Sequence, residues 1–461
     1  MSTWTEHELR FLDLGDARLE ERAVQLVDAL AARPEASVPQ ATVSWAATKA
    51  AYRFWDNDRV DPQDLYDAQR DSLLTRLPAP GPLLALQDTT DLNFTAHPRT
   101  RGLGYLGRAT QHGLWVHSAL LADADGVPLG LLHQHVWTRD PAELGKRQDR
   151  DRKETADKES QRWLDAQAAT HRALPPGRPV ITVADREADF YDLFAAPRAA
   201  YQHLLIRVRS RRRVRHELRL LGAAVAASPA RGQIRVLVSR QPGRPARAAV
   251  LTLRFLEVVL EPPANHPRRS QLRPLPLTAV LAVEEEPPPG QKPLHWLLLT
   301  TREVPDFAAA VQVVRYYSLR WLVERYHFTL KSGCRIEELQ LETADRLRRA
   351  LATYALVAWR LLWLTYQARA HPEGSCTTVL EADEWQVLQQ QFPAEAVAAG
   401  EAPSLGQAVR WIARLGGFLA RRRDGEPGVQ VLWRGLRRLA DLVTGWRLAQ
   451  AHAPPTVVGN V

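Results

Sequence analysis

The segment YSLRWLVERYHFTLK, residues 317–331, carries a single carboxylate, Glu324, with Tyr317, Arg320 and Lys331 at helical spacing. At roughly 100° per residue, these four side chains fall within about 60° of one helix face. An acid on such a face can bind a metal ion, while the cations and the phenol beside it can bind phosphate. The same spacing also suits ordinary ion pairs on a solvated face.

Two further carboxylates end apolar strands. Asp88 ends LLALQD, and Asp185 ends PVITVAD. The carboxyl end of a sheet is the usual place for α/β sites, although turns also favour Asp at strand ends. Asp91, Glu187 and Asp189 lie beside these two acids, and spacing alone does not choose among them.

Three carboxylates brought together repel one another unless a cation lies among them. Mg²⁺ or Mn²⁺ suits such oxygen ligands. A pair of such ions, roughly 4 Å apart, can activate an attacking oxygen and stabilise a leaving one in phosphodiester chemistry. Asp88, Asp185 and Glu324 therefore form a candidate two-metal site, with Tyr317, Arg320 and Lys331 placed to hold phosphates.

Apolar runs predict the elements that position these acids. Residues 5–80 have helical periodicity, and residues 306–370 and the C-terminal region are also expected to be helical. Between them, strands broken by one charged helix predict an α/β core with a mixed sheet. Residues 211–292 are rich in Pro and Arg with short β-like runs, which predicts an inserted β subdomain.

Composition favours a soluble protein with a polyanionic partner, since the net charge is +9 and the apolar content is 45%. The cations are nearly all arginine, which suits phosphate but is equally typical of a GC-rich genome. Two cysteines, Cys334 and Cys376, cannot build a disulfide framework, so we expect a reducing cytoplasm. The most apolar helix, 351–368, contains Arg360 and is interpreted as a core helix, so no membrane partner is expected.

The motifs together resemble the insertion-sequence-four group of DDE transposases, in particular those of the transposon-five type. Y-x2-R-x3-E-x6-K is complete, and LQDTTDLNF and VADREADFYDLF are similar to the group's first and second Asp motifs. WVHSALL, GLLHQHVW, LHWLLLTT and WIARLGGF are also similar. The resemblance runs in order along nearly the whole chain.

The resemblance implies a ribonuclease-H-like core in which Asp88, Asp185 and Glu324 bind two metal ions, Mg²⁺ or Mn²⁺. It selects Asp88 and Asp185 over their acidic neighbours. Side chains that would contact DNA are Tyr317, Arg320, Lys331, Arg207, Arg209, Arg18, Arg22 and Trp296. Trp296 would stack on a flipped base, although a core tryptophan is its plainer interpretation. Arg207 and Arg209 also suit a solvated edge strand, and His327 is interpreted as packing or a DNA contact.

The implied domains are a helical DNA-end-binding domain over 1–75, a catalytic core over 76–372 with residues 211–292 inserted, and a helical dimerisation domain over 373–461. The implied function is bacterial cut-and-paste transposition, in which double-stranded inverted-repeat ends are cut, with a hairpin intermediate, and joined to target DNA by a homodimer. Such a protein would act in the cytoplasm at the nucleoid. Two alternatives are an inactive DNA-binding regulator and a nuclease that cuts without joining.

Overall fold

The chain begins with a group of short helices that pack on a long central helix. A computed structural model describes residues 3–79, 81–140, 155, 158–238, 246–398, 400–421 and 424–451. The N-terminal helices are α1 (Trp4–Glu8), α2 (Ala17–Ala32), α3 (Val38–Thr42), α4 (Trp45–Trp55) and α5 (Pro62–Leu74). Asp16, Ser44 and Asp61 cap α2, α4 and α5 by accepting hydrogen bonds from the first-turn amides.

A ten-stranded mixed sheet forms the core, in the order β2-β3-β1-β5-β6-β10-β9-β8-β7, with β4 paired to β3. β1, β5 and β6 are parallel, and the other pairs are antiparallel. The strands are β1 (Leu83–Asn93), β2 (Gly104–Tyr105), β3 (His112–Ala122), β4 (Pro128–Trp137), β5 (Val180–Ala184), β6 (Gln202–Arg207), β7 (Gly232–Val238), β8 (Arg247–Leu260), β9 (Leu275–Val283) and β10 (His295–Thr300). The predicted mixed-sheet α/β class is confirmed.

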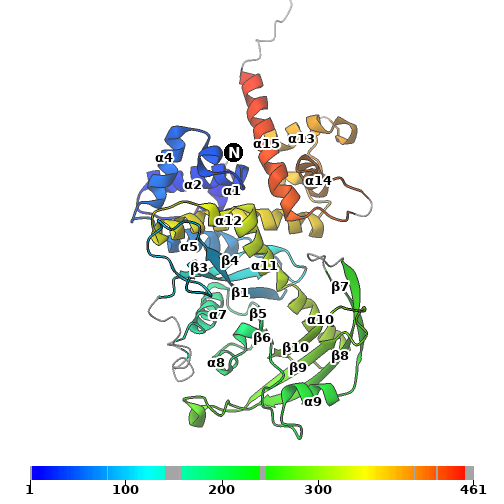
Figure 1. Cartoon of the computed structure of the whole chain (residues 1–461). Helices are drawn as coiled ribbons and strands as arrows, with labels where there is room; N and C mark the ends of the chain where they lie inside the picture. The colour runs from blue at the N-terminus through cyan, green and yellow to red at the C-terminus, as the bar shows by residue number, and fades with distance from the viewer. Residues whose placement is uncertain are drawn as a thin grey trace, which may run out of the picture.

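The strands of the expected insert do not form a sheet of their own. β9 pairs with the core strand β10, β8 with β9, and β7 with β8, so the insert extends the core sheet from one edge. Figure 1 shows these strands fanning away from the N-terminal helices. Sequence composition identified the strands of this region but could not reveal that they join the existing sheet.

Helices cover both faces of the sheet and connect it to the C-terminal region. They are α7 (Gln161–Ala173), α8 (Tyr191–Ala195), α9 (Leu221–Ala227), α10 (Phe307–Ser318), α11 (Trp321–Phe328), α12 (Ala344–Ala370), α13 (Ala382–Gln391), α14 (Leu405–Leu415) and α15 (Val429–Ala451). α7 packs against one face of β1, β3 and β4, where Trp163 lies edge-on to His117 of β3. α5, α11 and α12 pack against the opposite face. The strand β1, which carries Asp88, is therefore covered on both sides.

The sequence predicts one helix through residues 317–331, and the structure corrects this expectation. α10 ends at Ser318, Leu319 and Arg320 form a link, and α11 then begins. After α11 the chain widens into a π-helical turn, Thr329–Gly333, which carries Lys331. A π turn holds more residues than an α turn, so it rotates Lys331 out of the arc that regular spacing predicts. Helical periodicity cannot foresee such local changes of pitch.

The C-terminal helices pack against one another and against α12. α14 and α15 approach so closely that a Cβ atom on Gly435 would lie 1.8 Å from the Ile412 carbonyl oxygen, which requires glycine there. Figure 1 shows α1, α2 and α4 and the helices α13–α15 on the same side of α12, away from the sheet. In the part of the chain that the structure describes, no helix is long and apolar enough to cross a membrane.

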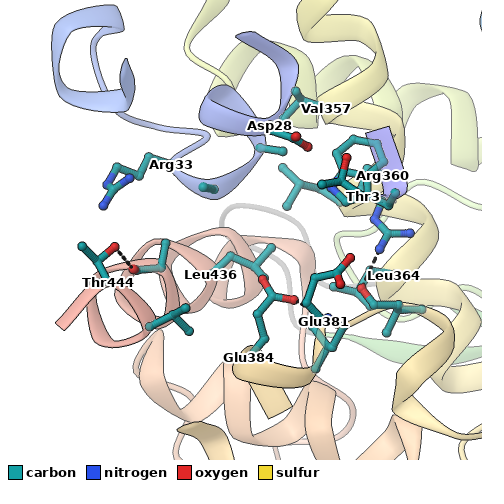
Figure 2. Close-up of a pocket in the computed structure, with 18 of the residues that line it drawn as sticks. Thr3, Asp28, Arg33, Val357, Arg360, Leu364, Glu381, Glu384, Leu436 and Thr444 are labelled. Atoms are coloured by element: carbon teal, nitrogen blue, oxygen red, sulfur yellow. Dashed lines mark hydrogen bonds between the residues drawn. The ribbon is translucent and has the colours of Figure 1, made fainter. Parts of the chain in front are cut away.

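A cavity of about 370 Å³ separates the N-terminal helices from the C-terminal helices. Figure 2 shows Asp28 and Arg33 on one side, Glu381 and Glu384 on the other, and Arg360 of α12 between them. Arg360 donates a hydrogen bond to the Val379 carbonyl oxygen at 2.6 Å. This place, which we call the interdomain junction, consists of the residues that line the cavity together with Glu8 and Trp363.

Candidate active site

Two parallel strands place two of the candidate acids side by side. β1 and β5 pair in parallel through Leu86 and Val183. Two residues further along each strand are Asp88 and Asp185, so the same register sets them at one level of the sheet. The Asp88 carboxylate accepts a hydrogen bond from Thr89 N at 2.9 Å, and the Asp185 carboxylate accepts one from Glu187 N at 2.8 Å. Asp185 directly follows the last residue of β5, whereas Asp88 lies in the middle of β1, which continues to Asn93, so the prediction that Asp88 ends a strand is wrong.

Burial raises the pKa of the Asp88 carboxyl to about 7. The Arg320 guanidinium opposes this shift, while the carboxylates of Asp185 and Glu324 add to it. The side chain of Asp88 is 17% exposed. The three acids predicted from the sequence therefore act on one another electrostatically, although they lie far apart in the chain.

Arg320 lies between the acids of β1 and α11. Its Nη1 donates to Asp88 Oδ2 at 3.3 Å, and its Nη2 donates to Glu324 Oε1. Burial lowers the pKa of Arg320, but the charges of Tyr317, Glu324 and Asp88 outweigh burial and raise it. The guanidinium thus supplies positive charge that the three carboxylates would otherwise lack.

The donor set fits divalent cations. Carboxylate oxygens are the ligands that Mg²⁺ and Mn²⁺ prefer, and Asp185 and Glu324 are close enough to Asp88 for their charges to add to the rise that burial causes in its pKa. Within the described residues, no three acidic, histidine or cysteine side chains lie close enough together to hold one ion. Arg320 lies between two of the acids, Asp88 and Glu324, and contacts both. A divalent ion would compete with its guanidinium for those oxygens.

A second group of predicted residues meets beside the acids. The rings of Trp296 on β10 and Tyr317 on α10 lie edge to face, with centroids 5.4 Å apart. Arg207 of β6 donates from Nη2 to the His295 carbonyl oxygen at 2.9 Å. Burial raises the pKa of Tyr317, and the charges of Arg320 and Arg207 oppose that rise. Four side chains expected to contact DNA are therefore neighbours.

Two donors of this group are buried without a hydrogen-bond partner. They are the Tyr317 hydroxyl and Arg207 Nε. A buried donor left unsatisfied costs about 1–3 kcal/mol, so such donors need an explanation. A phosphate oxygen placed between Tyr317 and the two guanidiniums of Arg207 and Arg320 would satisfy this need.

The other predicted residues lie further from the acids. Lys331 is paired with Asp91 at 3.5 Å, further along β1 than Asp88. Arg209 lines a separate cavity with Arg212 and Asp189, where its backbone N donates to Asp189 Oδ2. The structure therefore does not bring Arg209 together with Arg207.

Arg18 and Arg22 lie in the N-terminal helices, one turn apart on α2. They line a groove together with Lys49 and Arg53, which are one turn apart on α4. Arg22 Nε is buried without a partner, whereas Arg18 is paired with Asp16. Sequence reasoning missed the cations of α4, although their i,i+4 spacing matches that of Arg18 and Arg22.

Three family models match successive parts of the chain. The one described as transposase DNA-binding matches residues 1–60, and the one described as transposase DDE domain matches residues 157–360. The one described as transposase Tn5 dimerisation domain matches residues 356–455. The second includes Asp185 and Glu324, and the first includes the groove between α2 and α4.

Proposed function

The chain belongs to the DDE transposases of the Tn5 type, and from this premise we propose that it cuts the inverted-repeat ends of a mobile element and joins them to target DNA. A DDE transposase is a metal-dependent DNA endonuclease and strand transferase. Its partners are DNA and a second copy of the chain. The proposal concerns which residues do this work, which DNA is recognised and which intermediate forms.

One observation carries the proposal: the three acids Asp88, Asp185 and Glu324 influence one another beside two buried donors, the Tyr317 hydroxyl and Arg207 Nε, that have no hydrogen-bond partner. Asp88, Asp185 and Glu324 would hold the divalent ions, Mg²⁺ or Mn²⁺ and two in number. Such ions, when bound, activate an attacking oxygen and stabilise the leaving one. Neither the acids nor the donors alone would select a phosphodiester, but together they do.

The chain's own residues orient the DNA strand. Tyr317, Arg207 and Arg320 offer hydrogen-bond donors to one phosphate. To bind it, the Arg320 guanidinium gives up its hydrogen bonds to the carboxylates of Asp88 and Glu324. A phosphate bound there lies next to Asp88 and Glu324, because Arg320 contacts both. Holding the reacting groups in place supplies much of the rate enhancement in phosphoryl transfer.

Trp296 supports a hairpin intermediate. Its indole is half-buried and lies against Tyr317, one residue beyond the carbonyl that Arg207 binds. An unstacked base can lie on an indole at a gain of about 1–3 kcal/mol. When one base at the end of the duplex rotates out of the stack, the two strands can come closer together. A newly freed 3′-OH can then attack the opposite strand.

The remaining domains supply recognition and pairing. Residues 1–75 bind the inverted-repeat end through the groove of α2 and α4, residues 76–372 form the catalytic core, and residues 373–461 pair two complexes. Residues 1, 2, 80, 141–154, 156, 157, 239–245, 399, 422, 423 and 452–461 of these ranges lie outside the described residues. Because the substrate is chromosomal DNA, the protein acts at the bacterial nucleoid in the cytoplasm.

A cleavage assay on a duplex that carries the element's inverted repeat tests the proposal. With Mg²⁺ we expect a nick at the element's end, then a hairpin, and then integration into a plasmid. End binding without any nick would favour the regulator, and nicking without joining would favour the nuclease. The control is Asp88→Asn, which retains the volume of the side chain but loses its charge.

A further inference from the structure

A buried chain of hydrogen bonds lies directly beneath the catalytic acids. His327 Nε2 lies 3.1 Å from Ser118 Oγ, and Ser118 Oγ donates to Gln134 Oε1 at 3.1 Å. The Tyr326 hydroxyl donates to the same oxygen at 2.8 Å, and Gln134 Nε2 donates to the Tyr66 hydroxyl at 2.7 Å. All five side chains are buried. Polar groups are rarely placed so deep unless their mutual geometry matters.

This network connects α11, which carries Glu324, to β3, the strand paired with the part of β1 that carries Asp88. Ser118 of β3 is the direct cross-strand partner of Asp88 on β1, so both side chains point to the same face of the sheet. His327 follows Glu324 by three residues on α11, about one helical turn. The bond between His327 and Ser118 therefore spans the gap across which Glu324 must meet Asp88.

The hydrogen-bond directions fix the state of His327. Ser118 has one proton, which it gives to Gln134, so Ser118 Oγ can only accept from His327. His327 must carry its proton on Nε2. Burial lowers the pKa of His327 to about 3, and the charges of Lys331 and Arg320 add to that effect, so the ring is neutral. The link is a single neutral hydrogen bond of defined polarity.

We propose that His327 and Ser118 are positioning residues, whose hydrogen bond sets the rotation and height of α11 so that Glu324 faces Asp88 across the metal site. This proposal rests on the metal-binding role given above to Asp88 and Glu324. Regular α-helix does not continue beyond either end of α11, because the link at Leu319–Arg320 precedes it and the π-helical turn follows it. A side-chain hydrogen bond to the sheet can therefore fix the orientation of α11. Gln134 and Tyr326 hold Ser118 in turn, and Tyr66 is the outer end of the network, on α5.

The test is the affinity for Mn²⁺ measured by electron paramagnetic resonance on the full chain bound to an end duplex. His327→Leu and Ser118→Ala should each weaken Mn²⁺ binding about 10- to 100-fold, the usual effect of removing a group that orients a metal ligand. His327→Gln should stay near the wild-type affinity, because its amide nitrogen reaches the position of Nε2. The rates of nicking at saturating Mn²⁺ should follow the same order.

Tyr66→Phe is the matched control. It removes one hydrogen bond from the same network, at the end away from α11, so it should lower the melting temperature as Ser118→Ala does while Mn²⁺ affinity is kept. The proposal is overturned if His327→Leu binds Mn²⁺ as wild type does, if His327→Gln fails to restore binding, or if Tyr66→Phe weakens it equally. Asp88→Asn separates the two ideas: if it leaves Mn²⁺ affinity unchanged, the metal site itself is wrong.

Discussion

The molecule places an arginine among carboxylates in two regions, and the two arginines differ in what surrounds them. In the active site, Arg320 contacts the carboxylates of Asp88 and Glu324. At the interdomain junction, Arg360 binds the Val379 carbonyl oxygen and lies over the rings of Trp4 and Trp363, at 4.9 and 4.7 Å from their centroids. Arg320 contacts carboxylate oxygens that a metal ion could bind in its place, whereas Arg360 contacts a backbone carbonyl oxygen and two indole rings that stabilise the fold.

The pKa values of the two arginines express this difference. At Arg320, Tyr317 and the carboxylates of Glu324 and Asp88 together outweigh burial and raise the pKa of the guanidinium. Burial outweighs acid charge at Arg360 and lowers its pKa to about 10, with Glu8 and Glu384 opposing the shift. At Arg320 the neighbouring oxygens favour the cation more than burial disfavours it, whereas at Arg360 burial prevails over the nearby carboxylates. Burial of an arginine among acids does not by itself identify a metal site.

The largest effect should come from the three acids. Asp88→Asn, Asp185→Asn or Glu324→Gln should each lower nicking roughly a thousandfold or more, since a catalytic metal ion supplies several kcal/mol of transition-state stabilisation. Glu384→Gln at the junction should leave nicking unchanged. Gel-shift measurements should show that all four variants still bind the end duplex. Substantial nicking by any active-site variant would remove that acid from the set.

Exchanging each arginine for methionine should separate the two regions. Arg320→Met should slow nicking about a hundredfold, because about 3 kcal/mol of phosphate binding is lost. Arg360→Met should instead lower the free energy of unfolding by about 2–3 kcal/mol, through loss of a charged hydrogen bond and two ring contacts. Denaturant unfolding and single-turnover nicking report these effects. If Arg360→Met slowed nicking without lowering the free energy of unfolding, Arg360 would not have the purely structural role that distinguishes it from Arg320.

The tryptophans near the two arginines form a second matched pair. Trp296→Ala should reduce hairpin yield about 5- to 100-fold while sparing the first nick, because a stacked base gains about 1–3 kcal/mol. Trp363→Ala should lower the melting temperature and leave the ratio of hairpin to nick unchanged, since Trp363 packs on Arg360 and Trp359. If Trp296→Ala gives the same hairpin yield as wild type, Trp296 does not stack on a base and serves only in packing.

The two regions should respond to pH in opposite directions. The pKa of His327 is about 3 in the folded chain and about 6.5 when unfolded, so its contribution to stability is complete above pH 6.5 and is lost as pH falls toward 3. Burial raises the pKa of Glu384, so its contribution is complete below the unfolded value near 4.5 and is lost as pH rises.

The corresponding glutamine variants check these signs by denaturant unfolding across pH. His327→Gln should reduce the loss of stability below pH 6.5 by up to about 1.4 kcal/mol per pH unit. Glu384→Gln should make the chain more stable than wild type at neutral pH, because glutamine can retain the hydrogen bond from Glu381 N that caps α13. Parallel pH profiles in both variants and wild type would contradict the assignment.

A third arginine environment, the exposed groove of α2 and α4, should give the smallest effect. Lys49→Ala and Arg22→Ala should each weaken end binding and reduce the slope of log affinity against log salt by about 1, since each removes one phosphate contact. Arg33→Ala is the control, because Arg33 is paired with Asp441. If the salt dependence of end binding is the same in the groove variants as in wild type, the DNA does not bind in this groove.

Part of the site could be predicted because the apolar runs that precede Asp88 and Asp185 are local features of the sequence. Asp88 and Asp185 end apolar runs, and parallel pairing of β1 with β5 then sets them together. The break of the expected helix at Leu319–Arg320 could not be predicted, because tertiary packing selects the local pitch. Nor could the link between Ser118 and His327, since it depends on which face of β3 meets α11.

The extent of the sheet also could not be predicted from the sequence. Alternating residues on β7 and β8 predict strands, but they do not reveal the neighbour with which each strand pairs. The same holds for Arg207 and Arg209, which lie close in sequence: Arg207 bonds to the His295 carbonyl oxygen, whereas Arg209, beyond the end of β6, lines a cavity with Asp189 and Arg212. Local patterns predict element types, and long-range pairing decides which side chains meet.

Hydroxyl-radical cleavage by bound Fe²⁺ tests the central claim most directly. Fe²⁺ substituted at the metal site of the DNA-bound chain generates radicals that cut the backbone nearby. Sharing of ions by the three acids predicts cuts near Asp88, Asp185 and Glu324 together, all suppressed by excess Mg²⁺ and all lost in Asp88→Asn. Cuts near only one of these residues, or cuts that persist in Asp88→Asn, would contradict a shared site.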